Sequence, residues 1–583
     1  MKQETRKCLL LVGIFLLFFI VANILISNML FIFKIEITKF NMIIAYVITV
    51  ILILLLLKKL GLSKYNKIKN IMLVIVLPTI LILLSLFLNS KVMDFSYDGN
   101  TYHKATIGLL KEGWNPVYET ASEFDNSRKN KIYIENSSSE LWTDCYARAT
   151  HIFQANAYAL TGSIESGKAV NTLSILSLFL IIFSYLSLKL KKIIFPLMFA
   201  SCCATYSVVS AQYLTMYIDF FVYIYLLLLL LSFFIIEFNQ SEQEQNIGFL
   251  IYSLSLIMLI NIKFNSFAYA GIFCLGYYIY YIIKLIKHKI EKKFFVKFTI
   301  ISTVCVIIGT CIIGLSVYVK NFIEYGNPFY PLFGEDKVDI ITTNQPYEFK
   351  DKSTIEKYFI SMFSEVENMA QASQRETNLK IPFTIRRTEL NYISAPDTRI
   401  SGNGVLFSGI FIISVLLLLV TSIKMYKDNK KVFIMCSIPL TITILMILLL
   451  SESWWARYFP QTYFIILTVI LYLYFLKRKM YKSFLLILIT LILINNSITF
   501  IQATRYNYSL TKSANNEFRL IKENVDKENE RLVIKTPIFI GSLYNISDNL
   551  KDYKIVVLKR NSDEELNNSL MNGLAYWKWE SNE

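Results

Sequence analysis

Long apolar runs alternate with polar segments along the whole chain. A helix rises about 1.5 Å per residue, so about twenty apolar residues cross the roughly 30 Å of hydrocarbon in a bilayer. Backbone groups inside lipid must hydrogen-bond within their own segment, so each run is predicted to be a helix. The pattern predicts an all-α integral membrane protein with about 13 transmembrane helices, at 8–32, 41–57, 71–89, 170–188, 193–210, 215–236, 247–262, 266–283, 299–319, 405–423, 432–450, 461–476 and 484–501.

Three polar segments are too long to be simple turns between these helices. They cover 90–169, 320–404 and the tail from 502. The chain is therefore predicted to comprise a transmembrane domain over 1–501, with the first two segments as large loops, and a C-terminal appendage over 502–583. Function is to be sought in these segments, because the rest of the chain is mostly lipid-spanning.

Start and stop signals predict the elements of the first polar segment. A short helix is expected after Asp98, ending near Gly113. A second helix is expected over 143–160, with Gly162 as its end signal.

The other two segments also contain regular elements. Ser353-Thr354-Ile355-Glu356 is a capping box that opens an amphipathic helix. In the tail, a helical pattern around Phe518 precedes two strand-like runs at 531–535 and 554–558. The tail is therefore predicted to be a small α/β unit.

Composition agrees with a membrane environment and excludes one class of partner. Of the 583 residues, 55% are hydrophobic and 17% are charged, and the mean hydropathy is +0.47, so the lipid bilayer is the expected partner. The formal net charge is +16. Lys and Arg lie in short clusters rather than in a basic stripe, so no nucleic-acid binding is expected. The eight cysteines lie mostly in apolar runs and form no CxxC pair.

The basic clusters predict the orientation. They fall in alternate loops, at 58–70, 189–192, 284–298, 424–431 and 477–482. Cytoplasmic loops carry an excess of Lys and Arg, so the N-terminus is placed in the cytoplasm. The three polar segments and the C-terminus then lie outside a multi-pass protein of the cell membrane.

Two carboxylates follow the third apolar run directly. Asp94 and Asp98 are four residues apart where the chain leaves the membrane. A reaction between a membrane-anchored donor and an acceptor hydroxyl needs one carboxylate to take the hydroxyl proton, while the second orients the acceptor or the base. The plainer interpretation is that both are solvated residues at the membrane edge.

At this point the sequence resembles a known family. Tyr97-Asp98-Gly99 with Tyr102-His103 and the following Gly113-Trp114-Asn115-Pro116 are similar to the first outer loop of bacterial GT-C glycosyltransferases, which use polyprenyl-phosphate sugars. Later segments follow in family-like order, over most of the chain from about 90 to 465: 142–146, 160–162, 167–168, 212–219, 262–264, 325–331 and 452–458.

The resemblance implies a catalytic base and a pair of substrates. An acid in the first outer loop serves as base in that family, which points to Asp98, with Asp94 as the fallback. This chain departs from members with two adjacent acids, because Gly99 follows Asp98. The expected reaction is an inverting transfer, on the outer face, from a polyprenyl-phosphate sugar donor to a glycan, lipid or protein hydroxyl.

Donor phosphate requires compensating positive charge, and several residues are candidates for substrate binding. Arg457 is the strongest, because it lies in a short outer loop where basic residues are disfavoured. The full set is His103, Arg148, Asp219, Lys263, Lys320, Trp455 and Arg457. The plainer interpretations are snorkelling cations, a neutral hydrogen-bonding histidine, a helix-capping or paired aspartate and an aromatic belt.

The sequence gives little sign of a cofactor. The three histidines have no metal-ligand spacing. A divalent cation held by Asp94 and Asp98 is compatible with the pattern but is not required by it. No Walker loop or GxGxxG follows a strand, so a cytoplasmic nucleotide sugar is not the expected donor.

Two other classes remain open. An envelope polysaccharide polymerase or ligase also has many helices and a large outer loop, and Arg386, Arg387 and Arg399 in the second polar segment fit such an enzyme. A transporter or flippase is the third alternative, although inverted halves and ionisable residues at mid-span are not evident.

Overall fold

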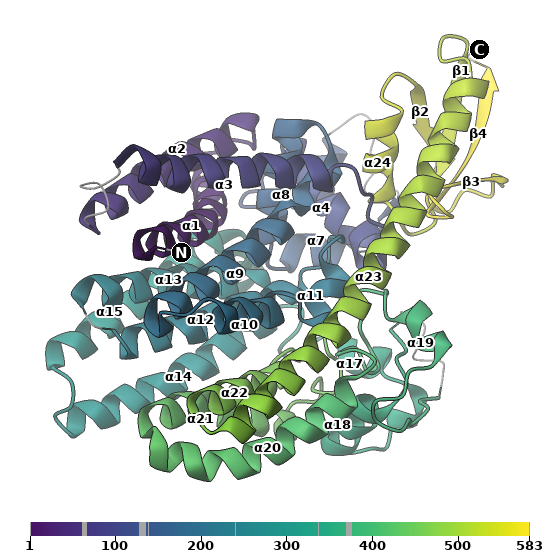
Figure 1. The fold of residues 1–583 in the computed structure, drawn as a ribbon. Helices are drawn as coiled ribbons and strands as arrows, with labels where there is room; N and C mark the ends of the chain where they lie inside the picture. Colours follow the sequence, from purple (N-terminus) through teal and green to yellow (C-terminus); the bar gives the residue numbers. More distant parts are fainter. Residues whose placement is uncertain are drawn as a thin grey trace.

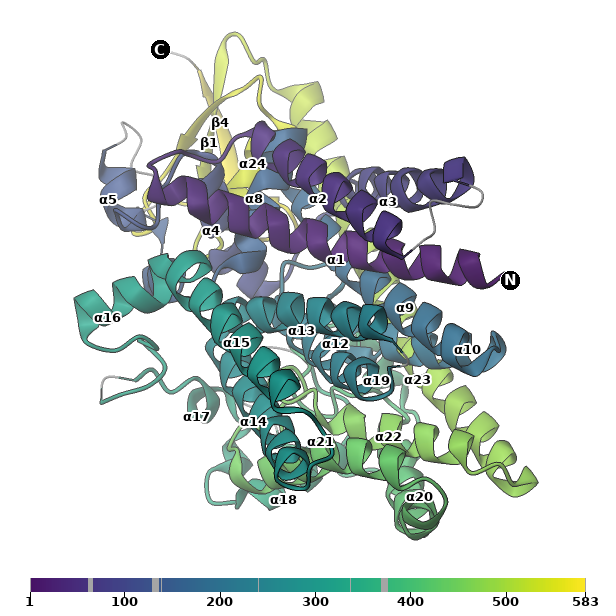
Figure 2. The same ribbon diagram turned by 90° about the vertical axis from the view of Figure 1, so that its left-hand side faces the viewer.

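The computed structural model describes residues 2–60, 67–127, 136–137, 139–239, 241–335, 337–368 and 376–581. Within these ranges, 11 helices are long and apolar enough to cross a membrane. Their helical cores are α1 (Gln3–Ile32), α2 (Lys39–Lys59), α3 (Lys67–Asn89), α9 (Ala169–Leu190), α12 (Asp219–Glu237), α13 (Glu242–Ile262), α14 (Phe264–Ile286), α15 (Lys292–Ile307), α20 (Phe407–Asp428), α21 (Lys430–Leu449) and α23 (Lys479–Asn524). The chain is thus a multi-pass, mostly helical membrane protein (Figures 1 and 2).

The other two predicted spans are shorter apolar helices. The run at 461–476 forms α22 (Thr462–Phe475), and the run at 193–210 forms α10 (Ile194–Ala204) followed by α11 (Ser207–Gln212). The prediction of one continuous helix over 193–210 was therefore wrong. The Ser210 hydroxyl donates a hydrogen bond to the Thr205 carbonyl at 2.8 Å. This side-chain bond occupies a backbone acceptor at the break.

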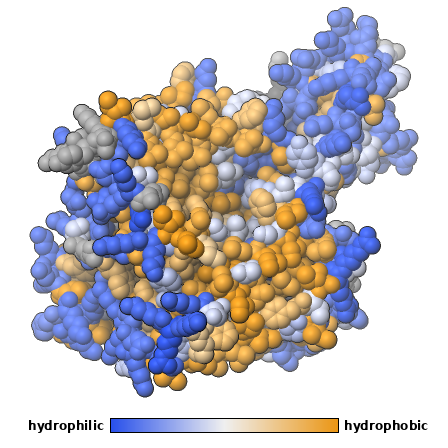
Figure 3. Space-filling model, viewed as in Figure 1, coloured by the Kyte–Doolittle hydropathy of each residue, from blue (hydrophilic) through white to orange (hydrophobic). Residues whose placement is uncertain are grey.

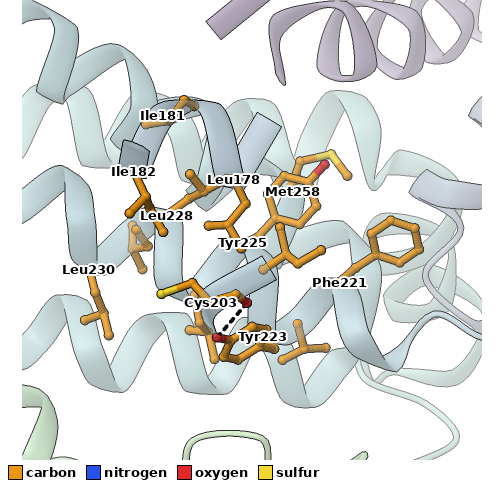
Figure 4. Packing of buried hydrophobic residues seen from close by; sticks show 14 of the residues in the cluster. Leu178, Ile181, Ile182, Cys203, Phe221, Tyr223, Tyr225, Leu228, Leu230 and Met258 are labelled. Atoms are coloured by element: carbon orange, nitrogen blue, oxygen red, sulfur yellow. Dashed lines mark hydrogen bonds between the residues drawn. The ribbon is translucent and has the colours of Figure 1, made fainter. Parts of the chain in front are cut away.

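The surface and the interior both fit lipid as solvent. Figure 3 shows a broad apolar belt between hydrophilic edges and a hydrophilic projection formed by the tail. At the centre, α12 and α13 pack together and are mostly buried, and their apolar residues are spread around the helix rather than confined to one face. Figure 4 shows part of this core, in which the Tyr223 hydroxyl of α12 donates to the Cys203 carbonyl of α10 at 3.0 Å.

The first polar segment folds into short helices. A π-helical turn, η1 (Gly99–His103), leads into α4 (Lys104–Lys111) and is followed by α5 (Ala121–Asn126). The predicted helix over 143–160 is interrupted, since α7 (Glu140–Cys145) ends before α8 (Ala149–Thr161) begins. Between them, Arg148 donates to the carbonyls of Thr143 and Asp144, which occupies acceptors at the end of α7. Gly162 closes α8 with a left-handed φ of 72°, as predicted.

The second polar segment is a chain of turns and short helices. A π-helical continuation of α15, η3 (Ile308–Ile313) and η4 (Leu315–Val319), leads into α16 (Lys320–Tyr325), α17 (Ile340–Asn344), α18 (Thr354–Phe363) and α19 (Arg387–Tyr392). The capping box at the start of α18 is confirmed, because the Ser353 hydroxyl accepts from the Glu356 amide.

The tail continues the last membrane helix without a break. The helix α23 runs through Asn524 and reaches a four-stranded sheet of order β2-β1-β4-β3. The two predicted strands are confirmed as β1 (Glu530–Lys535) and β2 (Lys554–Val557), which pair in parallel. The sequence pattern missed β3 (Asn568–Leu570) and β4 (Ala575–Ser581), which pair antiparallel.

The tail rests on the first polar segment. The helix α24 (Ser542–Asn549) contacts α4, and the Gly541 amide donates to the Asn100 carbonyl at 2.7 Å. The Tyr158 hydroxyl donates to Asp548 at 2.7 Å. A shared apolar cluster joins the two regions, so they lie at the same end of the helix bundle (Figure 1). This placement agrees with their predicted location on one side of the membrane.

Candidate functional site

A cavity of about 460 Å³ lies where the two large loops meet the ends of the membrane helices. Its charged lining consists of three carboxylates and three cations: Asp98, Asp219, Asp397, Lys263, Arg399 and Arg457. Its aromatic lining comprises Tyr97, Tyr102, Trp142, Tyr146, Tyr217 and Tyr458, and its uncharged polar lining comprises His103, Thr343 and Asn344. The volume falls in the usual range for small-molecule sites.

Arg457 is the centre of the charge network. Its Nη1 lies 2.8 Å from Asp98 Oδ2, 3.1 Å from Asp397 Oδ1 and 3.7 Å from Asp219 Oδ2. The guanidinium carbon also lies about 5 Å from the ring centroids of Tyr217, Trp455 and Tyr458. Four separate stretches of chain thus hold one cation in place.

Two of the three carboxylates have a second cation of their own. Lys263 Nζ lies 2.5 Å from Asp219 Oδ1, and the Arg399 side chain pairs with Asp397. Among the ion pairs of the described residues, Asp98 pairs with Arg457 alone. The Asp98 side chain also keeps 18% of its surface exposed, against 3% for Asp219 and 6% for Asp397. Asp98 is therefore the most accessible and least compensated carboxylate in the cavity.

Local structure explains the glycine that follows Asp98. It immediately precedes the π-helical turn η1, which starts at Gly99. A Cβ atom on residue 99 would lie 2.0 Å from Asp94 Oδ2 and 2.3 Å from Ser96 Oγ. The close approach of Asp94 leaves no room for a second acidic side chain after Asp98, which accounts for the glycine at this position.

The environment of Asp98 raises its proton affinity. Burial raises the pKa of the Asp98 carboxyl above its usual range, the Arg457 charge opposes that rise, and the Asp397 carboxylate adds to it. The protonation of Asp98 therefore depends on where the Arg457 charge lies, which makes the pair responsive to an anion that enters the cavity.

His103 is paired with a second buried histidine. Its Nδ1 lies 2.6 Å from His151 Nε2, so one ring donates a hydrogen bond to the other. Burial lowers the pKa of both rings, that of His151 to about 3, and the neighbouring positive charges lower the pKa of His103 further. The pair is therefore neutral at physiological pH, and only His103 lines the cavity.

Asp94 belongs to a separate, enclosed network. Its carboxylate accepts hydrogen bonds from Ser96 at 2.9 Å and from the Met216 amide at 3.1 Å. It is fully buried and does not line the cavity. Glu165 accepts from the Asp94 amide and pairs with Lys104 at 2.8 Å. These contacts indicate a structural role for Asp94, which holds the first polar segment against the helix bundle.

Three other residues predicted to bind substrate also lie outside the cavity. Arg148 is buried, donates to Ser316 Oγ at 2.9 Å and stacks over Trp114. Lys320 donates to the carbonyls of Pro116 and Glu119. Trp455 packs behind the cavity, where its Nε1 donates to the Asp397 carbonyl at 2.6 Å. Of the candidate site residues, the cavity gathers Asp98, His103, Asp219, Lys263 and Arg457.

Sequence reasoning missed Asp397 and did not assign Arg399 to the transferase site. Arg399 reaches across to α17, where it donates to the Asn344 carbonyl and side chain at 2.9 Å. Its guanidinium also stacks on Trp455. The available signal was an acid and an arginine two residues apart, close before the span at 405. That signal is weak, because such pairs are common on solvated loops.

No group of three or more His, Cys, Asp and Glu side chains is arranged to hold a metal ion within the part of the chain that the structure describes. The three cavity carboxylates surround the Arg457 guanidinium instead. Asp94 and Asp98 do not share the cavity, so the pair considered for a divalent cation is not brought together there.

Comparisons with known proteins identify no relative: no family model, curated protein or solved structure matches this chain.

Proposed function

We propose that this protein is a GT-C-like membrane glycosyltransferase that moves a sugar from a polyprenyl-phosphate donor to an acceptor hydroxyl. The observation that carries the proposal is the contact between Asp98 and Arg457 on one cavity at the ends of the membrane helices. A transferase of this kind needs a proton acceptor next to a cation that compensates a lipid phosphate.

The reaction assigns a role to each group. The acceptor oxygen attacks the anomeric carbon, and Asp98 takes the acceptor proton. The bond between that carbon and the phosphate oxygen breaks, and polyprenyl phosphate leaves with the bonding electron pair. Attack and departure on opposite faces invert the configuration. Arg457 and Lys263 compensate the charge that develops on the departing phosphate.

Donor binding would also activate the base. Carboxylates hold Arg457 in the cavity, so a phosphate must compete with them for the guanidinium. Asp219 and Asp397 would retain Lys263 and Arg399, whereas Asp98 would lose the one ion-pair partner that it has among the described residues. Since the Arg457 charge opposes the rise in the Asp98 pKa, its capture by phosphate makes Asp98 a stronger base when the donor is present.

The proposed setting follows from the charge pattern. The cavity and all three polar regions would face the outside of the cell membrane, with the N-terminus in the cytoplasm. The donor would enter from the bilayer with its isoprenoid chain between helices, and the acceptor would be a glycan, lipid or protein of the cell envelope.

The test is sugar transfer in membranes that contain single variants. Asp98→Asn keeps the side-chain shape but removes the base, so transfer from a panel of polyprenyl-phosphate sugars should fall by about 10²-fold or more. Asp94→Asn is the matched control, because it makes the same change four residues away and off the cavity. It should lower the melting temperature while leaving kcat near that of the parent protein.

Two outcomes would contradict the proposal. Full activity of Asp98→Asn would remove the acid–base role, and loss confined to Asp94→Asn would move it to the buried carboxylate. Cysteine labelling of 90–169 from the cytoplasmic side would contradict the orientation.

One observation favours a second candidate, an envelope polysaccharide polymerase or ligase. Arg399, one of the arginines typical of a large outer loop in such enzymes, lines the same cavity. Arg386 and Arg387 are exposed and do not. A polymerase or ligase would transfer an oligosaccharide from a lipid carrier and leave monosaccharide donors unused, so the donor panel separates the two candidates.

A further inference from the structure

A second crevice lies at the opposite end of the helix bundle from the Asp98 cavity. It has a volume of about 960 Å³ and lies between the start of α1, the turn from α9 to α10, the end of α22 and the start of α23. The helix α9 begins beside the first polar segment and ends at this crevice, and α22 begins next to the Arg457 loop and ends there. The crevice is thus separated from the cavity by the thickness of the bundle.

The charged lining of this crevice is entirely positive. Arg6, Lys191, Lys192, Lys477 and Lys482 line it, without any aspartate or glutamate. Among the ion pairs of the described residues, none involves these five cations. Arg6 donates from Nη1 to the Ser187 carbonyl at 2.5 Å, but its Nε is buried without a hydrogen-bond partner. Like charges around one space repel one another, and an anion between them is attracted to all five.

Other basic loops at this end differ from the crevice. Lys284 and Lys431 pair with Glu237, and Lys189 pairs with Glu244. At these three positions an acid compensates the cation, whereas the lining of the crevice gathers five cations and no acid.

The remaining lining is mostly apolar and aromatic. Phe195 stacks on Tyr474 with ring centroids 3.7 Å apart, and Met198 and Leu485 are among the other apolar residues of the walls. At the rim, Ile194 is 76% exposed, as a residue in contact with acyl chains would be. A ligand must therefore combine a negative head with a hydrophobic body.

We propose that this crevice binds an anionic phospholipid, with its phosphate among the five cations and its acyl chains along the Phe195 and Leu485 wall. Basic pockets between membrane helices are suited to such head groups, and each cation near the phosphate contributes about fivefold in affinity. This site is independent of sugar transfer, since no cavity residue takes part.

The test uses the full-length protein purified in a neutral detergent. Phosphatidylglycerol and phosphatidylcholine are titrated separately, bound lipid is counted by native mass spectrometry, and melting temperature is measured in parallel. The parent protein should retain and be stabilised by phosphatidylglycerol selectively. Equal stabilisation by soluble glycerol 3-phosphate would overturn the lipid assignment in favour of a phosphate site.

Two variants and one matched control test the location. The triple variant Lys191→Gln, Lys192→Gln and Lys477→Gln should weaken phosphatidylglycerol binding by about 10²-fold. The control Lys287→Gln, Lys289→Gln and Lys293→Gln removes the same charge from another loop at the same end and should retain binding. Equal weakening in both, or in neither, would overturn the proposal.

The second variant, Met198→Trp, fills the apolar part of the crevice without changing charge and should also reduce binding. Unchanged phosphatidylglycerol binding by a folded Met198→Trp protein would contradict the proposed position of the acyl chains.

Discussion

Arg457 donates a hydrogen bond to Asp98 at 2.8 Å although 359 positions separate the two residues in the chain. The contact joins the loop after the third membrane helix to the loop before α22 and so closes the cavity from both sides. Because the same Nη1 also lies 3.1 Å from Asp397, changes at either partner alter the charge that Asp98 experiences.

Opposite shifts in pH dependence are therefore expected from two single variants. Arg457→Gln removes the charge that opposes the rise in the Asp98 pKa, so the acidic limb of the kcat/KM profile should move to higher pH. Asp397→Asn removes a carboxylate that raises the Asp98 pKa, so the same limb should move to lower pH. Profiles of both variants, with transfer from a polyprenyl-phosphate sugar as readout, check the prediction.

Arg457→Lys is the charge-conserving control. Lysine restores the point charge but not the planar fork that contacts several carboxylates, so its shift should be smaller than that of Arg457→Gln. Activity should fall by about 10²-fold or more in Arg457→Gln, because a compensating donor to the phosphate is lost. Shifts in the same direction for Arg457→Gln and Asp397→Asn would contradict the electrostatic coupling.

The sequence was sufficient for most of the membrane helices, because apolar run length is a local property. Runs such as 71–89 must be helical wherever they lie, and α3 confirms this one. The breaks at Thr205 and Tyr146 were not foreseeable in this way. They depend on side chains such as Ser210 and Arg148 taking over backbone acceptors, and a hydropathy pattern does not contain that information.

A residue of the candidate site could be predicted from the sequence where its charge is unusual for its position in the chain. Arg457 in a short loop, Asp219 at the start of an apolar run and Asp98 after a span each conflict with a simple lipid-facing role. Asp397 has no such conflict in its own loop. Its place in the site depends on the docking of the second polar segment against α11, where Gln212 donates to the Pro396 carbonyl at 2.8 Å.

The buried pair of Lys263 and Asp219 gives a prediction about stability. Lys263→Met or Asp219→Asn alone leaves one partner poorly compensated and should cost about 3–5 kcal/mol. The double variant should cost clearly less than the sum, because neither charge is then left alone. A double-mutant cycle of unfolding in mixed detergent measures the coupling. Additive effects of the two substitutions would contradict a direct interaction between Lys263 and Asp219. Because Arg457 lies 3.7 Å from Asp219, it also compensates that carboxylate and is expected to reduce the coupling.

The histidine pair predicts a loss of stability in acid. An unfolded histidine binds a proton below about pH 6.5, whereas burial lowers the folded pKa of His151 to about 3 and also lowers that of His103. Their contribution is therefore complete above about pH 6.5 and is lost as the pH falls toward 3. Each group should change the free energy of unfolding by up to about 1.4 kcal/mol per pH unit in that window.

Melting temperatures at pH 7.5, 6, 5 and 4 measure this effect. His151→Gln keeps a hydrogen-bonding side chain at the position but cannot titrate, so its melting temperature should vary less with pH than that of the parent protein. An equal pH dependence in the variant would assign the acid sensitivity to other groups. His288, which is exposed on a loop at the opposite end, provides the control, since His288→Gln should leave the slope unchanged.

Gly99 offers a test of how closely the base is positioned, without any change in charge. In Gly99→Ala the new Cβ would lie 2.0 Å from Asp94 Oδ2 and 2.3 Å from Ser96 Oγ, so either the buried Asp94 network or the η1 turn must move. Movement of η1 displaces Asp98 from Arg457, and a misplacement of about 1 Å is enough to cost about 10²-fold in rate.

Gly271→Ala is the matched control. Gly271 also lies in a helix, but nothing lies within 4 Å of its Cβ position, so this variant should be neutral or stabilised by up to about 1 kcal/mol. Transfer assays and melting temperatures of the two variants decide the matter. If Gly99→Ala folds with lower stability but full kcat, the strain is absorbed by Asp94 alone, and the geometry of η1 does not limit the reaction.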